Sequence, residues 1–280
     1  MARPDVLERV IGGLPALEMG AGPPLVVLPG LAFHHEAPRG VERRVELAPF
    51  EPLAVHRRVV RLSRRRGLDR PATMAGLATD YAVALRAAFD GPVDVLGVST
   101  GGSIAQQLAA DHPDVVARLV LVSTAIRLSP EGRTLQRRVA ARAEAGATRQ
   151  AAAVLVYELV PPRRGRVPAA VLARLVGDRF PSRAGDMSDM VATIEAEDSF
   201  DLTARAAEIR CPTLVVAGAE DRFYGPELPG ETARLIPGAR LVLYEGRGHI
   251  TVMTDKRFSA DVEAFLSSPA VPPPATSTPG

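Results

Sequence analysis

The sequence predicts an α/β fold, with a mostly parallel central sheet flanked by helices and an inserted helical cap. Short apolar runs of strand length recur along the chain. They are continuous rather than alternating, which suits strands covered on both faces of a parallel sheet. Alanine- and leucine-rich segments with helical spacing lie between several of these runs. Strands that alternate with helices in this way indicate an α/β sheet.

The predicted elements follow one another in a regular order. Helices are expected at 72–89, 102–113 and 256–268, and the second of these ends at a proline, as helices tend to. The expected strands are "PLVVLPG" (24–30), "RRVVRLS" (57–63), "VDVLGVS" (93–99), "ARLVLVSTA" (117–125), "PTLVVAGAED" (212–221) and "ARLVLYEG" (239–246).

The strand pattern stops between about 127 and 208 and resumes at Pro212. The interrupted region contains several helix-like segments separated by prolines. We therefore expect a core domain formed by 1–126 and 209–267, with a helical cap inserted at 127–208. The last segment, 268–280, is rich in proline, serine and threonine and is expected to be disordered.

Composition excludes several classes of protein. The 280 residues are 46% hydrophobic and carry a formal net charge of only +2, so nothing in the charge indicates a nucleic-acid partner. A single cysteine, Cys211, excludes a disulfide framework or a cysteine-based zinc site within one chain. We expect no secretory signal and no span long enough for a bilayer, and therefore a cytoplasmic protein without a membrane partner.

The densest basic run, "HRRVVRLSRRRG" (56–67), is expected to be a strand whose arginine heads reach solvent. An anion site is the alternative interpretation of this run.

The segment "GVSTG" (97–101) has the form G-x-S-x-G, between a predicted strand and a predicted helix. A hydroxyl is a poor nucleophile unless it is lifted from the surface and placed beside a base. A tight strand-to-helix turn does this, and the flanking glycines leave room for a crowded backbone. Ser99 is therefore a candidate nucleophile, and a polar turn residue is the alternative.

A serine nucleophile needs a base and an acid that orients the base. Of the five histidines, His249 in "YEGRGH" follows a predicted strand and lies in a loop at the same sheet edge. Asp221 directly follows another strand, and the neighbouring Glu220 is the alternative carboxylate. The chain order of serine, acid and histidine is one of the orders in which such triads occur. We predict Ser99, Asp221 and His249 as the catalytic residues.

Five segments together resemble the α/β-hydrolase family, in its branch with a serine nucleophile and a helical cap. They are "PLVVLPGLA", "RRRGLDRPATMAGLATDYAVAL", "GVSTGG", "PTLVVAGAEDRF" and "YEGRGH", and the resemblance covers about residues 10 to 267. Many members carry His-Gly in the oxyanion loop, where this chain has Pro29-Gly30. Because the donors are backbone N–H groups, the resemblance still implies an oxyanion hole built from Leu31 and Thr100. His34 and His35, just beyond the loop, are expected to be an exposed pair, and a place at the edge of the pocket is the alternative.

The expected activity is that of a serine hydrolase, which cleaves a carboxylic ester, lactone or thioester of a small molecule through an acyl-enzyme. A carbon–carbon bond hydrolase, a cofactor-free perhydrolase and a non-catalytic ligand-binding protein of the same fold stay open as alternatives. No cofactor and no metal are expected, and the oligomeric state is not determined by the sequence. Cap residues that could line an apolar pocket, or simply pack, are Leu155, Val156, Tyr157, Met187 and Met190.

Overall fold

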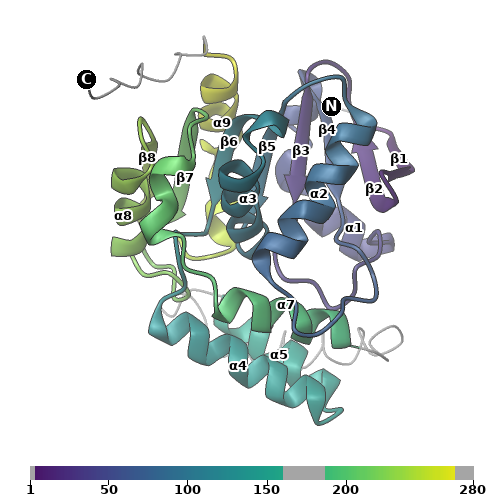
Figure 1. Cartoon of the computed structure of the whole chain (residues 1–280), viewed down its shortest axis with the longest axis vertical. Coiled ribbons are helices and arrows are strands. Elements are labelled where there is room, and N and C mark those ends of the chain that lie inside the picture. The colour runs from purple at the N-terminus through teal and green to yellow at the C-terminus, as the bar shows by residue number, and fades with distance from the viewer. Residues whose placement is uncertain (1–3, 160–186, 269–280) are drawn as a thin grey trace, which may run out of the picture.

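The computed structural model describes residues 4–159 and 187–268, with the backbone alone for 156–159. A twisted eight-stranded sheet runs through its centre (Figure 1). The strand order is β1-β2-β4-β3-β5-β6-β7-β8, in which β1 and β2 pair antiparallel, β2 joins β4 antiparallel, and the remaining neighbours are parallel. The strands are β1 (Val6–Ile11), β2 (Leu14–Met19), β3 (Pro24–Leu28), β4 (Arg58–Leu62), β5 (Val93–Val98), β6 (Val116–Val122), β7 (Thr213–Gly218) and β8 (Arg240–Tyr244).

Helices cover both faces of the sheet (Figure 1). Helices α2 (Met74–Ala88), α3 (Thr100–Asp111) and α8 (Glu227–Leu235) pack on one face, and α1 (Gly40–Leu47) and α9 (Phe258–Leu266) pack on the other. Short 3₁₀ segments lie at Ala48–Phe50, Leu53–Val55, Pro113–Val115, Thr203–Glu208 and Thr251–Thr254. Among the residues described, no helix combines the length and apolar character needed to cross a bilayer.

Strand β3 shows why the apolar runs are continuous. Leu25 and Val27 pack in the layer with α1 and α9, whereas Val26 and Leu28 pack in the layer with α2 and α3. All four side chains are at most 1% exposed, and burying each contributes about 1.5–3 kcal/mol. The predicted α/β class is therefore confirmed, as are the six predicted strands and the three predicted helices.

The hairpin of β1 and β2 is not among the strands expected from the sequence. Its strands are joined by Gly12 and Gly13, whose φ angles of 55° and 85° suit a tight hairpin turn. β1 is an edge strand, and most of its side chains are exposed. It therefore lacks the continuous apolar run by which the other strands were recognised.

Helices α4 (Pro130–Glu144), α5 (Thr148–Leu159) and α7 (Ser188–Asp198), here named the cap helices, lie between β6 and β7 in the sequence. Figure 1 shows them together at one end of the sheet. Apolar side chains such as Leu135 and Met190 form a buried cluster among them. The expected cap boundaries stay a prediction, because residues 160–186 lie outside the described part of the chain. The same holds for the disorder expected of the tail, of which only Ser268 is described.

The expectation that the arginines of the basic run reach solvent is wrong for Arg57, Arg61 and Arg64, which are only 2–4% exposed. β4 lies between β2 and β3 in the sheet, so side chains on and beside it are enclosed by the flanking layers. A buried charge is tolerated where it is paired and hydrogen-bonded. Arg57 donates to Asp94 at 2.9 Å, and Arg61 donates to Glu46 at 2.9 Å. The acceptors of Arg64 are described with the candidate active site.

Candidate active site

Several loops that carry the predicted site residues leave the same edge of the sheet. Strands β3, β5, β7 and β8 run parallel, so their carboxyl ends meet at one edge, the edge toward the cap helices in Figure 1. Ser99 follows β5, Asp221 follows β7, and His249 follows β8. Binding sites of parallel α/β sheets lie at this edge.

Ser99 occupies a strained turn between β5 and α3. Its φ and ψ angles are 51° and −123°, a conformation that costs about 1–3 kcal/mol and persists only where the surroundings impose it. The flanking glycines are required by close packing. A Cβ on Gly97 would lie 2.5 Å from the carbonyl oxygen of Gly101, and one on Gly101 would lie 2.2 Å from that of Leu28. The turn therefore lifts the Ser99 side chain above the sheet edge.

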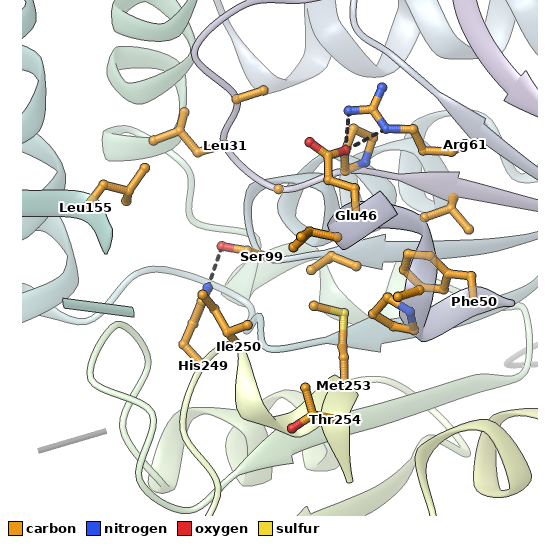
Figure 2. Close-up of a pocket in the computed structure, with 18 of the residues that line it drawn as sticks. Leu31, Glu46, Phe50, Arg61, Ser99, Leu155, His249, Ile250, Met253 and Thr254 are labelled. Atoms are coloured by element: carbon orange, nitrogen blue, oxygen red, sulfur yellow. Dashed lines mark hydrogen bonds and ion pairs between the residues drawn. The ribbon is translucent and has the colours of Figure 1, made fainter. Parts of the chain in front are cut away.

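The structure joins Ser99, His249 and Asp221 in one chain of hydrogen bonds. His249 Nε2 lies 2.9 Å from Ser99 Oγ (Figure 2), and His249 Nδ1 lies 2.8 Å from Asp221 Oδ2. An ionised carboxylate only accepts, so the proton of the neutral imidazole sits on Nδ1. The lone pair of Nε2 then faces the Ser99 hydroxyl, which is the geometry of a general base. Asp221, and not Glu220, meets the histidine.

Further contacts hold the second carboxylate oxygen of Asp221 and both the backbone and the ring of His249. Asp221 Oδ1 accepts from the Phe223 N–H at 2.8 Å, and Ser123 Oγ donates to the His249 carbonyl at 2.6 Å. The centroid of the Phe223 ring lies 4.8 Å from that of the imidazole. The Tyr224 ring stacks on the imidazole, with 5.9 Å between the ring centroids and 12° between the ring planes. His249 is only 6% exposed. The imidazole is therefore fixed in one orientation.

The two predicted oxyanion donors flank Ser99. Leu31 follows β3 and lines the same cavity as Ser99. A Cβ on the preceding Gly30 would come within 3.4 Å of the Ser99 Cβ, so the two loops nearly touch. Thr100 is the first residue of α3, where free N–H groups and the helix dipole favour negative charge.

Arg64 holds the predicted oxyanion loop in place, a role that the sequence analysis missed. Its guanidinium group donates from Nη1 to the Pro29 carbonyl at 2.9 Å and from Nη2 to the Gly30 carbonyl at 2.7 Å. The side chain is buried, so these carbonyl groups satisfy an enclosed charge. These two hydrogen bonds fix the backbone of the loop at Pro29-Gly30.

The expectation of an exposed histidine pair is wrong, because His34 is half-buried and His35 is only 2% exposed. His35 is held by two hydrogen bonds. Its Nε2 accepts from Arg64 Nε at 3.1 Å, so its proton lies on Nδ1, which donates to the Arg65 carbonyl at 2.7 Å. Burial, reinforced by the Arg64 charge, lowers the pKa of His35 to about 3. The ring therefore supports Arg64 as a neutral imidazole.

We predict that His35 makes stability fall as the solution is acidified. Its pKa in the folded state is below the usual value of about 6.5, so between about pH 3 and 6.5 the unfolded chain binds the additional proton. Its contribution is complete above about pH 6.5 and falls by up to about 1.4 kcal/mol per pH unit below it. The measurement is denaturant unfolding at pH 7.5 and 5.5 of the parent and of His35→Gln, whose amide can keep both hydrogen bonds. An equal loss in both proteins would contradict the prediction.

A cavity of about 660 Å³ opens beside Ser99 (Figure 2). Most of its lining is apolar, with Leu155 on one side of Ser99 and Phe50 on the other. Within the described residues, no group of three or more His, Cys, Asp or Glu is arranged to hold a metal ion. The polar side chains that line the cavity are Glu46, Arg61, Ser99, Gln136, His249 and Thr254.

The structure separates the cap residues that were expected either to line a pocket or to pack. Leu155 lines the cavity. Met187 and Met190 are buried in the apolar cluster of the cap helices, so they pack rather than form the cavity wall. The side chains of Val156 and Tyr157 lie outside the described part of the chain.

A family model described as "Alpha/beta hydrolase family" matches residues 25–262. The chain belongs to the alpha/beta hydrolase family. Among curated relatives of this alpha/beta hydrolase, RutD of Caulobacter sp. (strain K31), named provisionally as a carbamate hydrolase, is 30% identical over 212 residues. That match covers 73% of this chain and 76% of the relative. Polyketide synthase ThaQ of Burkholderia thailandensis is 38% identical over 109 residues, which are 36% of this chain but 5% of ThaQ.

Solved structures agree with the family assignment of this alpha/beta hydrolase. A hydrolase from Pseudomonas aeruginosa PA01 has a TM-score of 0.75 and 27% identity, covering 94% of this chain and 99% of that one. An enol-lactonase from Burkholderia xenovorans LB400 has a TM-score of 0.73 and 24% identity, covering 94% of this chain and 100% of that one. The second likeness shows a shared fold alone.

Proposed function

We propose that the chain is a serine hydrolase that cleaves an ester-like bond of a small molecule through an acyl-enzyme. One observation carries this proposal. A single imidazole lies within hydrogen-bond distance of both Ser99 Oγ and Asp221 Oδ2, beside an apolar cavity. A nucleophile, a base and an orienting acid in contact are the arrangement that activates a serine hydroxyl.

In the first half-reaction, Ser99 Oγ attacks the carbonyl carbon while its proton moves to His249 Nε2. The carbonyl oxygen becomes an oxyanion, to which the N–H groups of Leu31 and Thr100 donate. The adduct then collapses. The bond to the leaving group breaks, and His249 gives its proton to the departing atom, which leaves an acyl group on Ser99.

In the second half-reaction, a water molecule attacks the acyl carbon and passes a proton to His249. The bond between the acyl carbon and Ser99 Oγ breaks, and the proton returns to that oxygen as the carboxylic acid is released. Asp221 stays ionised in both half-reactions and stabilises the imidazolium that forms.

The size and the apolar lining of the cavity favour an apolar substrate of moderate size. Its volume of about 660 Å³ lies within the range of roughly 300–1,000 Å³ typical of small-molecule sites. Carboxylic esters, lactones and thioesters all present the carbonyl that this mechanism attacks. A carbamate presents one too, and the provisional name of the Caulobacter relative is a reason to test it.

Covalent labelling tests this function without knowledge of the natural substrate. We expect a fluorophosphonate probe to form one adduct, with Ser99 Oγ bonded to phosphorus, fluoride released and the serine proton taken by His249. Mass spectrometry of the peptide that contains Ser99 locates the adduct. In parallel, p-nitrophenyl esters, lactones, thioesters and carbamates are screened for hydrolysis. A chain that neither labels at Ser99 nor hydrolyses any of them contradicts the proposal and favours a ligand-binding protein.

A further inference from the structure

Glu197 is a fully buried carboxylate that none of the steps above uses. It belongs to the cap helix α7, and its exposed fraction is 0%. Among the described residues, four side chains lie within hydrogen-bond distance of its two oxygens. They are Thr100 Oγ1 at 2.6 Å, Ser103 Oγ at 2.8 Å, Gln136 Nε2 at 2.8 Å and Tyr224 OH at 3.2 Å.

These four contacts fit an ionised carboxylate, which accepts two hydrogen bonds at each of its two oxygens. Thr100 and Gln136 meet Oε2, and Ser103 and Tyr224 meet Oε1. Burial, together with the Glu197 charge, raises the pKa of Tyr224, so its phenol keeps the proton that it donates. A carboxylate removed from water is tolerated only with such a set of donors. The four side chains therefore share one acceptor, the Glu197 carboxylate.

The side chains tied to Glu197 belong to different parts of the site. Thr100 follows the nucleophile, and its N–H is one of the two proposed oxyanion donors. Tyr224 stacks on the imidazole of His249. Gln136 comes from the cap helix α4 and lines the cavity. A carboxylate of one cap helix thus connects the nucleophile turn, the histidine and the cavity wall.

We propose that Glu197 is a positioning residue, which acts through Thr100 to hold the nucleophile turn and its oxyanion donor in the geometry required for attack. The inference rests on the proposed function. Ser99 has a φ of 51°, so its conformation depends on restraints from its surroundings. The hydroxyl groups of Thr100 and Ser103, both in the first turn of α3, supply such restraints by binding the carboxylate. The active geometry therefore depends on how α7 is docked.

The first test is Glu197→Gln, which keeps the shape of the side chain and removes its charge. The hydroxyl groups around it can turn to accept from the new amide, so the fold is expected to persist, but each contact loses the charge of the carboxylate and becomes weaker. We expect kcat to fall on the order of 10–100-fold, because displaced oxyanion donors cost that much, with KM within about twofold. The rate of fluorophosphonate labelling at Ser99 should fall by the same factor. Glu195→Gln, which alters an exposed glutamate of the same helix that pairs with Arg70, is the matched control and keeps the parent rates.

The second test asks whether the effect passes through Thr100. Thr100→Val removes the hydroxyl that binds Glu197 and keeps the backbone N–H and the size of the side chain. We expect the same fall in kcat and in labelling rate as for Glu197→Gln. The double variant should be no slower than Thr100→Val, because Glu197→Gln weakens the same contact that Thr100→Val removes.

The outcomes separate this inference from the proposed function. If the parent neither labels at Ser99 nor hydrolyses an ester, the proposed function fails, and this inference fails with it. If the parent is active and a folded Glu197→Gln keeps the parent kcat and labelling rate, this inference alone is overturned. Effects that multiply in the double variant overturn the route through Thr100. If Glu197→Gln does not fold, Thr100→Val decides: slower labelling supports the inference, and the parent rate overturns it.

Discussion

Replacing Ser99 with alanine is expected to lower kcat for ester hydrolysis by roughly 10⁶-fold, the loss that removal of a serine nucleophile produces in a hydrolase with this kind of site. The substitution deletes the atom that is proposed to attack the carbonyl carbon, and nearby hydroxyl groups of the described residues are held elsewhere. Ser103 Oγ, for example, donates to Glu197. The measurement is steady-state hydrolysis of an ester that the parent cleaves, together with labelling by the fluorophosphonate probe.

The fold of this variant should survive. The lost hydrogen bond joins Ser99 Oγ to the side chain of His249 at the cavity, and the strained backbone of residue 99 is imposed by the surrounding loops. We expect thermal unfolding to match the parent within the few degrees that about 1 kcal/mol produces. Ser267→Ala, which removes an exposed hydroxyl from the end of α9, is the control. A folded Ser99→Ala protein with the parent kcat would show that another residue performs the attack.

The sequence was most informative where the sheet is buried on both sides. Continuous runs such as that of β3 are apolar because each face of the strand packs under a layer of helices. The edge strand β1 has no such constraint and lay outside this pattern. Its signal was the pair Gly12-Gly13, because two successive glycines can supply the positive φ angles of a hairpin turn.

The sequence predicts the site residues because each follows a strand that ends at the same edge. Topology alone then brings Ser99, Asp221 and His249 together, although 150 residues separate the serine from the histidine. Arg64, His35 and Glu197 had no comparable signal. Residues with ionisable side chains are mostly exposed or only partly buried, and their burial here depends on acceptors or donors contributed by distant segments. Such partners become visible only when the tertiary structure is known.

Replacing Asp221 with asparagine is expected to lower kcat by roughly 10⁴-fold, through the wrong tautomer of His249 rather than through a change of fold. Asp221 accepts on both sides, from the imidazole at Oδ2 and from the Phe223 N–H at Oδ1. The Phe223 N–H always donates, so an asparagine turns its carbonyl oxygen toward it and its NH₂ group toward His249. The imidazole must then accept at Nδ1 and carry its proton on Nε2, where it has no lone pair for the proton of Ser99.

The neighbouring carboxylate provides the control for this prediction. Glu220→Gln changes the same charge one residue earlier, and the parent kcat is expected because it is Asp221 that contacts the imidazole. Hydrolysis of one p-nitrophenyl ester by both variants, with KM measured for each, compares the two positions directly. The residual activity of Asp221→Asn should rise with pH, because hydroxide can then replace the lost base. If Glu220→Gln were the slower of the two variants, the acid would be Glu220, and the hydrogen bond between His249 and Asp221 would not be the one that orients the base.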